Sequence, residues 1–369
     1  MTLGIPKEVK TDEFRVGATP FNVAQLIEDG HTVLVQRGAG EGSGFSDAQY
    51  RNAGAEVLTS AETLYARATL IVKVKEPQPS EYDLLSERHT LFCYLHLAPL
   101  PELVSVLIEK RVCAIAYETV ASDNLLPLLK PMSEIAGKMA PSVAACHLSR
   151  YQGGEGILIG GAVGVAPANV LIIGAGNAGF NAAKIAIGMG ADVTVLNRSA
   201  PKLEQLQKVL PSAKTALYSP EMLRELLPDS DVVISTVLIH GGATTPKLIT
   251  RDMLRKMKKG SVLVDITIDQ GGISETSRPT THTDPIFIEE EVLHYCVANM
   301  PGAYPKTATV ALTNATLPYI RKLANEGCPD AIKNDSSLAL GVNIFNGSVT
   351  NPAVAKALGL ESKALETLL

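Results

Sequence analysis

The sequence predicts an α/β protein made of two Rossmann-like, doubly wound parallel-sheet domains with a cleft between them. Two observations carry this prediction. Short apolar runs rich in branched residues alternate with segments whose apolar residues recur every three or four positions, as strands and helices alternate in a parallel sheet. A glycine-rich loop also joins one apolar run to a helical pattern. At 369 residues, 46% of them hydrophobic, the chain can bury two cores.

The N-terminal part contains five apolar runs that end at glycine, proline or polar residues, as strands do. They cover residues 3–8, 31–38, 70–77, 90–98 and 112–120. Residues 21–30 and 101–111 lie between such runs and have the apolar spacing of amphipathic helices. These elements predict one parallel sheet with helices in its crossovers.

A longer helix is predicted from about Met132 to the pair Gly153 and Gly154. Pro141 is expected to kink this helix or to mark a restart, because proline lacks the amide hydrogen and clashes with the preceding turn. A second series of strands follows at residues 169–176, 192–197, 231–237, 261–267 and 295–300, and residues 306–327 return to a helical pattern. We therefore predict a substrate domain of residues 1–128 plus 305–369 and a dinucleotide-binding domain of residues 129–304.

Composition and charge argue against several classes of protein. A net charge of −5 without a basic stripe argues against nucleic acid as a partner. Five scattered cysteines without a CxxC pair suggest neither a disulfide framework nor a metal site, and they fit a reducing cytoplasm. The uncharged stretch between Glu155 and Lys184 is apolar enough for a membrane span, but its many glycines and Pro167 favour a loop before a buried strand. The charged N-terminus lacks the apolar core of a signal peptide. We therefore expect a cytoplasmic protein that contacts no membrane.

The glycine-rich loop has the pattern G-x-G-x-x-G, formed by Gly174, Gly176 and Gly179. A strand precedes it, a helix follows, and a second strand comes next, which is the context that a dinucleotide site needs. The first glycine permits the tight turn, the second admits the pyrophosphate, and the third lets helix and strand pack closely. The alternative, a flavodoxin-like loop that binds no dinucleotide, lacks support from this context.

The end of that second strand departs from the usual NAD pattern. An acidic residue normally binds the ribose 2′-hydroxyl there, but this chain has Asn197, followed by Arg198 and Ser199. Asparagine removes the charge that repels a 2′-phosphate, and Arg198 is able to bind one. Alternatively, Asn197 still binds the ribose and Arg198 faces solvent. The residues alone leave NAD and NADP both open.

Three residues of the first domain are candidates for substrate chemistry. The fork of Arg15 suits a carboxylate, although a surface arginine is the common alternative. Lys75 ends a predicted strand and is able to hold a carboxylate or carbonyl, or is simply solvated. His96 is a candidate acid/base because histidine is the side-chain type that titrates near neutral pH without help, but a histidine after an apolar run is more often a core residue.

Two loops of the second domain complete the set of candidates. Asp269 follows the strand at 261–267 and precedes Gly271 and Gly272, which suggests close backbone approach. Asn299 and Met300 end the last predicted strand. Since sites on doubly wound sheets collect beyond the carboxyl ends of strands, both loops are expected near a bound nicotinamide.

At this point the sequence resembles the alanine dehydrogenases over essentially its whole length. Their superfamily also contains the NAD-binding component of proton-translocating transhydrogenase. The resemblance is carried by GIPKE, EFRV, KVKEP, YLHLA, AYETV, PMSEIAG, QGGEGILIGG, IDQGG, VANMP, PKT and LTNATLPY. The first block and the glycine-rich blocks are shared with transhydrogenase, whereas YLHLA, IDQGG and VANMP with PKT are more specific to the dehydrogenases.

The resemblance implies reversible NAD-dependent oxidative deamination of L-alanine to pyruvate and ammonia. It implies that Arg15 and Lys75 hold the carboxylate and carbonyl of pyruvate and that His96 is the acid/base. Asp269 would orient water or ammonia at the imine carbon, and Asn299 would border substrate and nicotinamide. The family also implies a homohexamer that binds these small molecules.

The expected cofactor contacts lie in the glycine loop and at strand ends of the second domain. They are Ser133, Gly174, Gly176, Asn177, Ala178, Gly179, Asn197, Arg198, Lys202, Ser219, Val237, Leu238, Ile266, Asp269, Asn299 and Met300. The chain departs from the family at three places: Asn197 replaces an acidic residue, Pro141 lies in a helix that typically lacks proline, and Gly17 replaces a common alanine.

Two alternatives remain open at this point. The first is a soluble nucleotide-binding subunit of a membrane transhydrogenase, which passes hydride to a partner and binds no amino acid. That function gives no reason for His96 and Asp269 to share a cleft. The second is a related dehydrogenase that acts on serine or glyoxylate, because pocket volume depends on side-chain placement.

Overall fold

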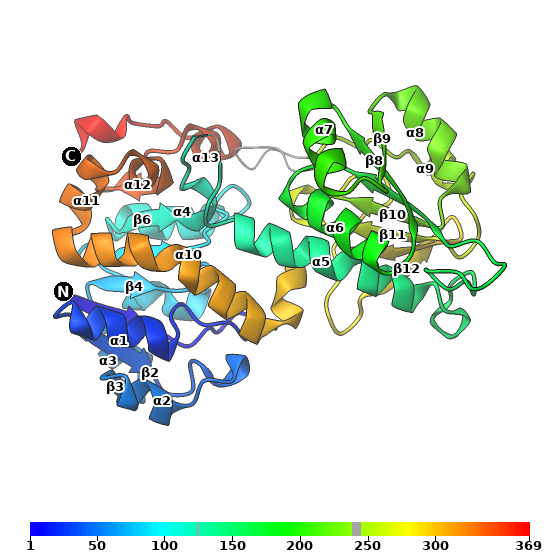
Figure 1. The fold of residues 1–369 in the computed structure, drawn as a ribbon. Coiled ribbons are helices and arrows are strands. Elements are labelled where there is room, and N and C mark those ends of the chain that lie inside the picture. Colours follow the sequence, from blue (N-terminus) through cyan, green and yellow to red (C-terminus); the bar gives the residue numbers. More distant parts are fainter. Residues whose placement is uncertain (124, 238–244) are drawn as a thin grey trace. The chain divides into compact units, whose positions relative to one another are not determined.

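The computed structural model describes residues 1–123, 125–237 and 245–369, which form two compact units (Figure 1). Unit 1 consists of Met1–Met132 with Tyr304–Leu369, and unit 2 consists of Ser133–Ala303. Both are α/β units, so the predicted fold class is confirmed. The domain boundaries and the roles assigned to the two domains stay predictions.

Unit 1 contains an eight-stranded sheet in the order β15-β14-β6-β5-β4-β1-β2-β3. Six strands are parallel, namely β1 (Thr2–Ile5), β2 (Thr32–Gln36), β3 (Glu56–Leu58), β4 (Leu70–Val72), β5 (Thr90–Cys93) and β6 (Cys113–Ala116). The hairpin of β14 (Val342–Phe345) and β15 (Ser348–Val349) adds an antiparallel edge next to β6. The sheet is therefore mixed, whereas the sequence predicted parallel strands alone.

Helices cover this sheet and bury branched side chains against it. They are α1 (Pro20–Glu28), α2 (Asp47–Asn52), α3 (Ala61–Arg67), α4 (Pro101–Glu109), α10 (Pro305–Glu326), α11 (Cys328–Asn334), α12 (Ser336–Gly341) and α13 (Pro352–Leu358). The helix α1 begins with a capping box in which the Thr19 side chain accepts from the Asn22 amide and the Asn22 side chain accepts from the Thr19 amide. The long helix α10 packs on α1, so the last part of the chain does return to the first sheet (Figure 1).

Unit 2 contains a seven-stranded sheet in the order β12-β13-β11-β10-β7-β8-β9. Its parallel strands are β7 (Asn169–Ile173), β8 (Asp192–Asn197), β9 (Lys214–Leu217), β10 (Val232–Ser235), β11 (Val262–Asp265) and β13 (Val292–Tyr295), and β12 (Ile286–Glu289) is antiparallel to β13. Numbered from β7, the parallel strands follow the order 3-2-1-4-5-6, which is that of dinucleotide-binding Rossmann sheets. The helices α6 (Asn177–Gly188), α7 (Ala200–Val209), α8 (Pro220–Leu226) and α9 (Arg251–Leu254) belong to this unit.

Two expectations for this part of the chain need correction. The helix α5 runs from Lys130 to His147 with Pro141 inside it, so no restart occurs at this proline, and the helix ends before the predicted pair Gly153 and Gly154. The strand predicted at 295–300 lies earlier, at Val292–Tyr295, because these four buried residues make the ladder to β12 and β11. Within the described residues, no helix combines the length and apolar character needed to cross a bilayer.

Candidate active site

Arg15, Lys75 and His96 follow β1, β4 and β5, three neighbouring strands of the unit 1 sheet. In this sheet the strand order reverses between β1 and β4, and ligands of doubly wound sheets bind at such a switch point, beyond the carboxyl ends of the strands. Arg15 and Lys75 belong to the two loops that flank the switch point, and His96 lies one strand further. The topology therefore brings these candidates to one edge of unit 1.

Arg15 is a buried arginine with 2% exposure, which excludes the surface alternative. Glu13 accepts from its Nε at 2.7 Å and from its Nη2 at 2.5 Å, a bidentate pair that fixes the plane of the guanidinium. The Nη1 of Arg15 points elsewhere and lies 3.1 Å from the sulfur of Met132. Burial raises the pKa of Glu13, but the hydrogen bonds and charge of Arg15, aided by the charge of Lys75, outweigh burial and hold it below its ordinary value.

The loop that carries Arg15 lies directly against the end of β4. A Cβ on Gly17 would lie 2.6 Å from the carbonyl oxygen of Val72, far inside van der Waals contact. The glycine at this place therefore permits the close approach of the two backbones. This packing holds Arg15 next to the strand that leads to Lys75.

A buried ion cluster holds the end of β4 in place below Lys75. Lys73 is fully buried, and its Nζ lies 2.8 Å from Glu81 Oε1 and 3.2 Å from Glu8 Oε2. Burial lowers the pKa of Lys73, but Glu8 and Glu81 raise it more, so the lysine stays charged. Lys75 itself is partly exposed. Lys73 and Lys75 stand two positions apart, and burial separates the structural lysine from the predicted candidate for substrate binding.

His96 is exposed, with 42% of its side-chain surface accessible, so it is no core histidine. Its backbone has φ of +45°, a left-handed conformation that is strained for a non-glycine residue. The carboxylate of Glu118 accepts from the His96 amide at 2.6 Å and lies 4.0 Å from its Nδ1, and the imidazole stacks on Tyr94. Surrounding groups therefore fix a strained, accessible histidine at the sheet edge, which is typical of functional residues.

Glu118 is a residue that sequence reasoning missed. It follows β6 and accepts from the amides of Leu95 and His96, so it orders the turn that presents the imidazole. The motif AYETV contains it, but nothing in the sequence shows that this glutamate reaches the turn after β5. Its partnership with His96 depends on the pairing of β5 with β6.

In unit 2 the glycine loop has the geometry that a pyrophosphate site needs. Gly174 adopts φ of +112°, which L side chains rarely adopt, and a Cβ on Gly179 would lie 1.9 Å from the Gly174 carbonyl oxygen. A Cβ on Gly176 would meet open space, so this is the point at which a ligand is able to approach the backbone. The helix α6 begins directly after Gly176 and directs its first amides at that space.

Asn197 links the end of β8 to the glycine loop. Its Oδ1 accepts from the Ala175 amide at 3.3 Å, and its Nδ2 donates to the Ser199 carbonyl at 3.2 Å. The exposed guanidinium of Arg198 lies over the ring of Tyr218, 5.4 Å from its centroid. Both residues thus lie where the ribose and its 2′-substituent are bound in Rossmann sheets.

Asp269 is exposed in a 3-10 turn, Ile268–Gln270, just beyond β11. The buried Asp265 organises the segment around it by accepting from the Thr267 hydroxyl at 2.6 Å, the Ile273 amide at 2.8 Å and the Ser277 hydroxyl at 2.6 Å. Asp265 was also missed, although a carboxylate at the end of a buried strand signals such a network. The loop is thereby ordered while Asp269 stays accessible.

Asn299 adopts φ of +61°, and its carbonyl accepts from the Gly302 amide at 2.8 Å and from His282 Nε2 at 3.1 Å. Asn299 is half-buried and the neighbouring Met300 is buried. This loop therefore resembles the His96 turn, in that hydrogen bonds fix a left-handed residue just beyond a strand.

The remaining predicted cofactor contacts are spread over unit 2. Ser133 lies in α5, Asn177 and Ala178 begin α6, and Val237 and Ile266 follow β10 and β11. Lys202 is exposed on α7, whereas Ser219 caps α8 by accepting from the Met222 amide at 3.1 Å. Leu238 lies outside the described residues.

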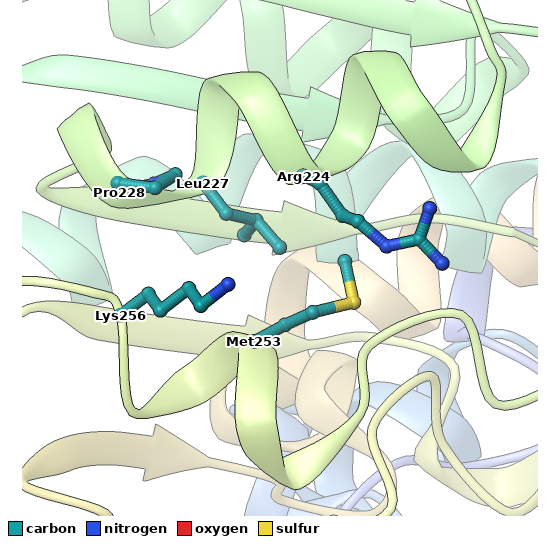
Figure 2. Close-up of a pocket in the computed structure, with 5 residues that line it drawn as sticks. All are labelled: Arg224, Leu227, Pro228, Met253 and Lys256. Atoms are coloured by element: carbon teal, nitrogen blue, oxygen red, sulfur yellow. The ribbon is translucent and has the colours of Figure 1, made fainter.

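One small pocket of unit 2 is drawn in Figure 2, between α8 and α9. Arg224, Leu227, Pro228, Met253 and Lys256 line it, and its volume is about 10 Å³. This is the space of about one water molecule, so the pocket takes no part in the candidate site.

The Rossmann strand order and the glycine loop place the chain in the class of dinucleotide-binding α/β proteins. The family models "Alanine dehydrogenase/PNT, N-terminal domain" and "Alanine dehydrogenase/PNT, C-terminal domain" match residues 4–136 and 140–352. The chain belongs to the alanine dehydrogenase/PNT family, as the sequence motifs predicted.

Relatives and solved structures agree with this assignment. The chain is 50% identical to an alanine dehydrogenase of Halomonas elongata over 98% of both chains, and 49% identical to alanine dehydrogenase 2 of Staphylococcus aureus over the full length of both. A solved L-alanine dehydrogenase matches 97% of this chain and 99% of its own, with a TM-score of 0.93 and 44% identity. A transhydrogenase from Sinorhizobium meliloti matches 96% of this chain and 100% of its own, with a TM-score of 0.81 and 25% identity.

Proposed function

We propose that this protein is an alanine dehydrogenase that catalyses the reversible NAD-dependent oxidative deamination of L-alanine to pyruvate and ammonia. The observation that carries the proposal is that the chain is 50% and 49% identical, over 98% and 100% of its length, to two proteins named alanine dehydrogenase. The transhydrogenase alternative has weaker support, because the solved transhydrogenase is 25% identical to this chain. The fixed Arg15 and the accessible His96, on one sheet edge of unit 1, supply the groups that a 2-oxo acid requires.

The reaction assigns separate tasks to the proposed residues. Arg15 and Lys75 bind the substrate carboxylate and carbonyl, which places the Cα for hydride transfer to the nicotinamide C4. His96 moves protons when ammonia leaves and when water adds to the iminium, steps that a positioned acid/base accelerates about 100-fold to 10,000-fold. Glu118 positions His96 through its backbone amide, and Asp269 orients water or ammonia at the imine carbon.

In unit 2 the Gly174–Gly179 loop binds the pyrophosphate of the dinucleotide, and Asn299 borders the nicotinamide and the substrate. NAD is the proposed cofactor, with NADP accepted as well. Asn197 is neutral and leaves one amide hydrogen for a ribose hydroxyl, because its other one binds Ser199. Arg198 supplies a cation for a 2′-phosphate. The homohexamer and the cytoplasmic location that the family implies belong to the same proposal, and light scattering of the purified protein measures the first.

Reductive amination tests the substrate assignment. Purified protein, ammonium and NADH are mixed in turn with pyruvate, hydroxypyruvate and glyoxylate, and NADH consumption is followed. We expect the highest kcat/KM with pyruvate. Consumption with none of the three, together with hydride exchange between two nicotinamide nucleotides, would support the transhydrogenase alternative. A preference for hydroxypyruvate or glyoxylate would instead assign a serine or glycine dehydrogenase.

A further inference from the structure

A cavity of about 500 Å³ lies in unit 1, at the edge of the sheet where the parallel strands begin. Thr90 and Cys113, the first residues of β5 and β6, line it together with Arg88, Arg111 and Cys328. The candidates for substrate binding follow the ends of β1, β4 and β5 in the same parallel sheet, so the cavity is at the opposite edge. No role in the proposed deamination accounts for it.

Two thiols meet at the wall of this cavity, although 215 positions separate them in the chain. The sulfur atoms of Cys113, at the start of β6, and Cys328, at the start of α11, are 3.0 Å apart. Cys113 is buried, whereas Cys328 is partly exposed. A disulfide bond joins its sulfurs at about 2.05 Å, so closing the gap requires a movement of about 1 Å.

The surroundings make the two thiols chemically unequal. The hydrogen bond with Cys113 lowers the pKa of Cys328, a hydrogen bond from Thr90 adds to this effect, and burial opposes it. The same contact with Cys328, together with burial, raises the pKa of Cys113. Both cysteines line the cavity, and Cys328 is the more exposed of the two, so it is the thiol that an oxidant reaches first.

We propose that Cys113 and Cys328 form an oxidisable dithiol that a small hydroperoxide, entering through the cavity, converts into a disulfide. The Cys328 thiolate attacks one peroxide oxygen, which breaks the O–O bond, releases hydroxide and leaves a sulfenic acid on Cys328. The sulfur of Cys113 then attacks the Cys328 sulfur, the S–S bond forms, and the sulfenic hydroxyl leaves with the Cys113 proton as water. With hydrogen peroxide the two thiols are oxidised by two electrons and two waters are produced. The new bond ties α11 to the sheet.

The first test is a count of thiols and of mass. The reduced full-length protein is treated with hydrogen peroxide, and free thiols are titrated in denaturant. We expect the five thiols of the reduced chain to fall to three, the intact mass to fall by about 2 Da through loss of two hydrogens, and a peptide map to join Cys113 to Cys328. Five remaining thiols, or linkage of another pair, would overturn the proposal.

Single-cysteine variants distinguish specific oxidation of Cys113 and Cys328 from unspecific oxidation of all the thiols. Cys328→Ser is expected to leave the other four thiols unoxidised at the same peroxide dose, whereas Cys113→Ser leaves a sulfenic acid on Cys328 that dimedone traps. Cys146→Ser removes an exposed cysteine of α5 and serves as the matched control, with the disulfide formed as in wild type. Equal thiol loss in Cys328→Ser and wild type would contradict the mechanism. Circular dichroism establishes that each variant is folded, and Cys328→Ala replaces any serine variant that is not.

Thermal unfolding gives a second, independent measurement. A cross-link between residues 215 positions apart closes a long loop in the unfolded chain, and such links typically stabilise through the unfolded state. The oxidised wild type should therefore unfold roughly 5–10 °C higher than the reduced protein. No such rise is expected for oxidised Cys328→Ser, and an equal rise there would assign the stabilisation to another group.

Discussion

At the residue scale, His96 is the group whose setting gives the clearest functional meaning. His96 has a left-handed backbone and an exposed side chain, and its amide donates to the carboxylate of Glu118. None of these features contributes to packing of the hydrophobic core. A side chain that is strained and accessible at a sheet edge is instead suited to proton transfer. Asn299 in unit 2 shares the left-handed backbone region beyond another strand, but it is half-buried.

Replacing the imidazole should separate turnover from cofactor binding. His96→Ala is expected to lower kcat by about 100-fold to 10,000-fold, the range of a lost general acid/base, and to change the Kd of NAD less than about twofold. Steady-state kinetics measure kcat, and isothermal titration with NAD measures the Kd. His31→Asn, at a histidine that bonds Asn325 in the same unit, is the control and should keep near wild-type kcat. A His96→Ala enzyme with most of its turnover would remove His96 from the catalytic step.

Cofactor choice is a second property decided by single residues. Asn197→Asp restores a negative charge near the ribose and should lower kcat/KM for NADP at least about tenfold relative to NAD, because the charge repels a 2′-phosphate. Arg198→Ala should weaken the binding of NADP but not that of NAD. The ring of Tyr218 holds the guanidinium in place, so its position does not depend on a contact with NAD. Kinetics with both nucleotides measure this. Equal losses for NAD and NADP in Arg198→Ala would show that the arginine binds the part common to both.

Residues that act through another strand were beyond sequence reasoning. Arg15, Lys75 and His96 stand in recognisable motifs at strand ends, and their position at one edge follows from the alternation of strands and helices. Glu118 and the Cys113–Cys328 contact depend on which strands and helices become neighbours, and no local pattern encodes that. The burial that distinguishes Lys73 from Lys75 is equally a product of packing.

At the element scale, the turn from β7 into α6 carries the dinucleotide function. Its backbone path is possible only where side chains are absent, because Gly179 touches the Gly174 carbonyl. The helix amides that follow are then directed at the ligand. The central strands were predictable from apolar runs and the dinucleotide loop from its glycine spacing, whereas β3, β9, β12 and the β14–β15 hairpin, which lie at the edges of the two sheets, were not predicted.

A methyl group at two glycines of α6 provides a matched pair of variants. In Gly179→Ala the new Cβ would lie 1.9 Å from a backbone oxygen, so the loop must shift, and we expect NAD affinity to fall at least about tenfold. In Gly188→Ala the Cβ meets open space. Binding should then be unchanged, and stability should rise by roughly 0.5–1 kcal/mol. Isothermal titration and thermal unfolding measure both effects, and equal NAD affinity in the two variants would contradict the assigned role of the loop.

At the scale of the whole molecule, buried charge in unit 1 links its stability to pH. The pKa of Glu13 is lower in the folded protein than its ordinary value of 4.5. Glu13 therefore binds a proton more readily in the unfolded chain than in the folded protein. The stabilisation that ionised Glu13 contributes is complete above about pH 4.5 and is lost as the pH falls through the pKa of Glu13 in the folded state. We expect the free energy of unfolding to decline below that value. Glu13→Gln should weaken this decline and lower stability near neutral pH, where Arg15 would lose its charged partner. Urea unfolding across pH 3–7 measures this, and an unchanged acid profile in the variant would refute it.

An initial-rate measurement on the intact protein is the most direct test of its assignment as an alanine dehydrogenase. Purified protein is supplied with L-alanine and either NAD or NADP, and formation of the reduced nucleotide is followed. We expect L-alanine-dependent turnover with NAD, lower but measurable turnover with NADP, and pyruvate and ammonia formed in equal amounts. Absence of turnover with both nucleotides, in a preparation that still binds NAD, would contradict the assignment as an alanine dehydrogenase.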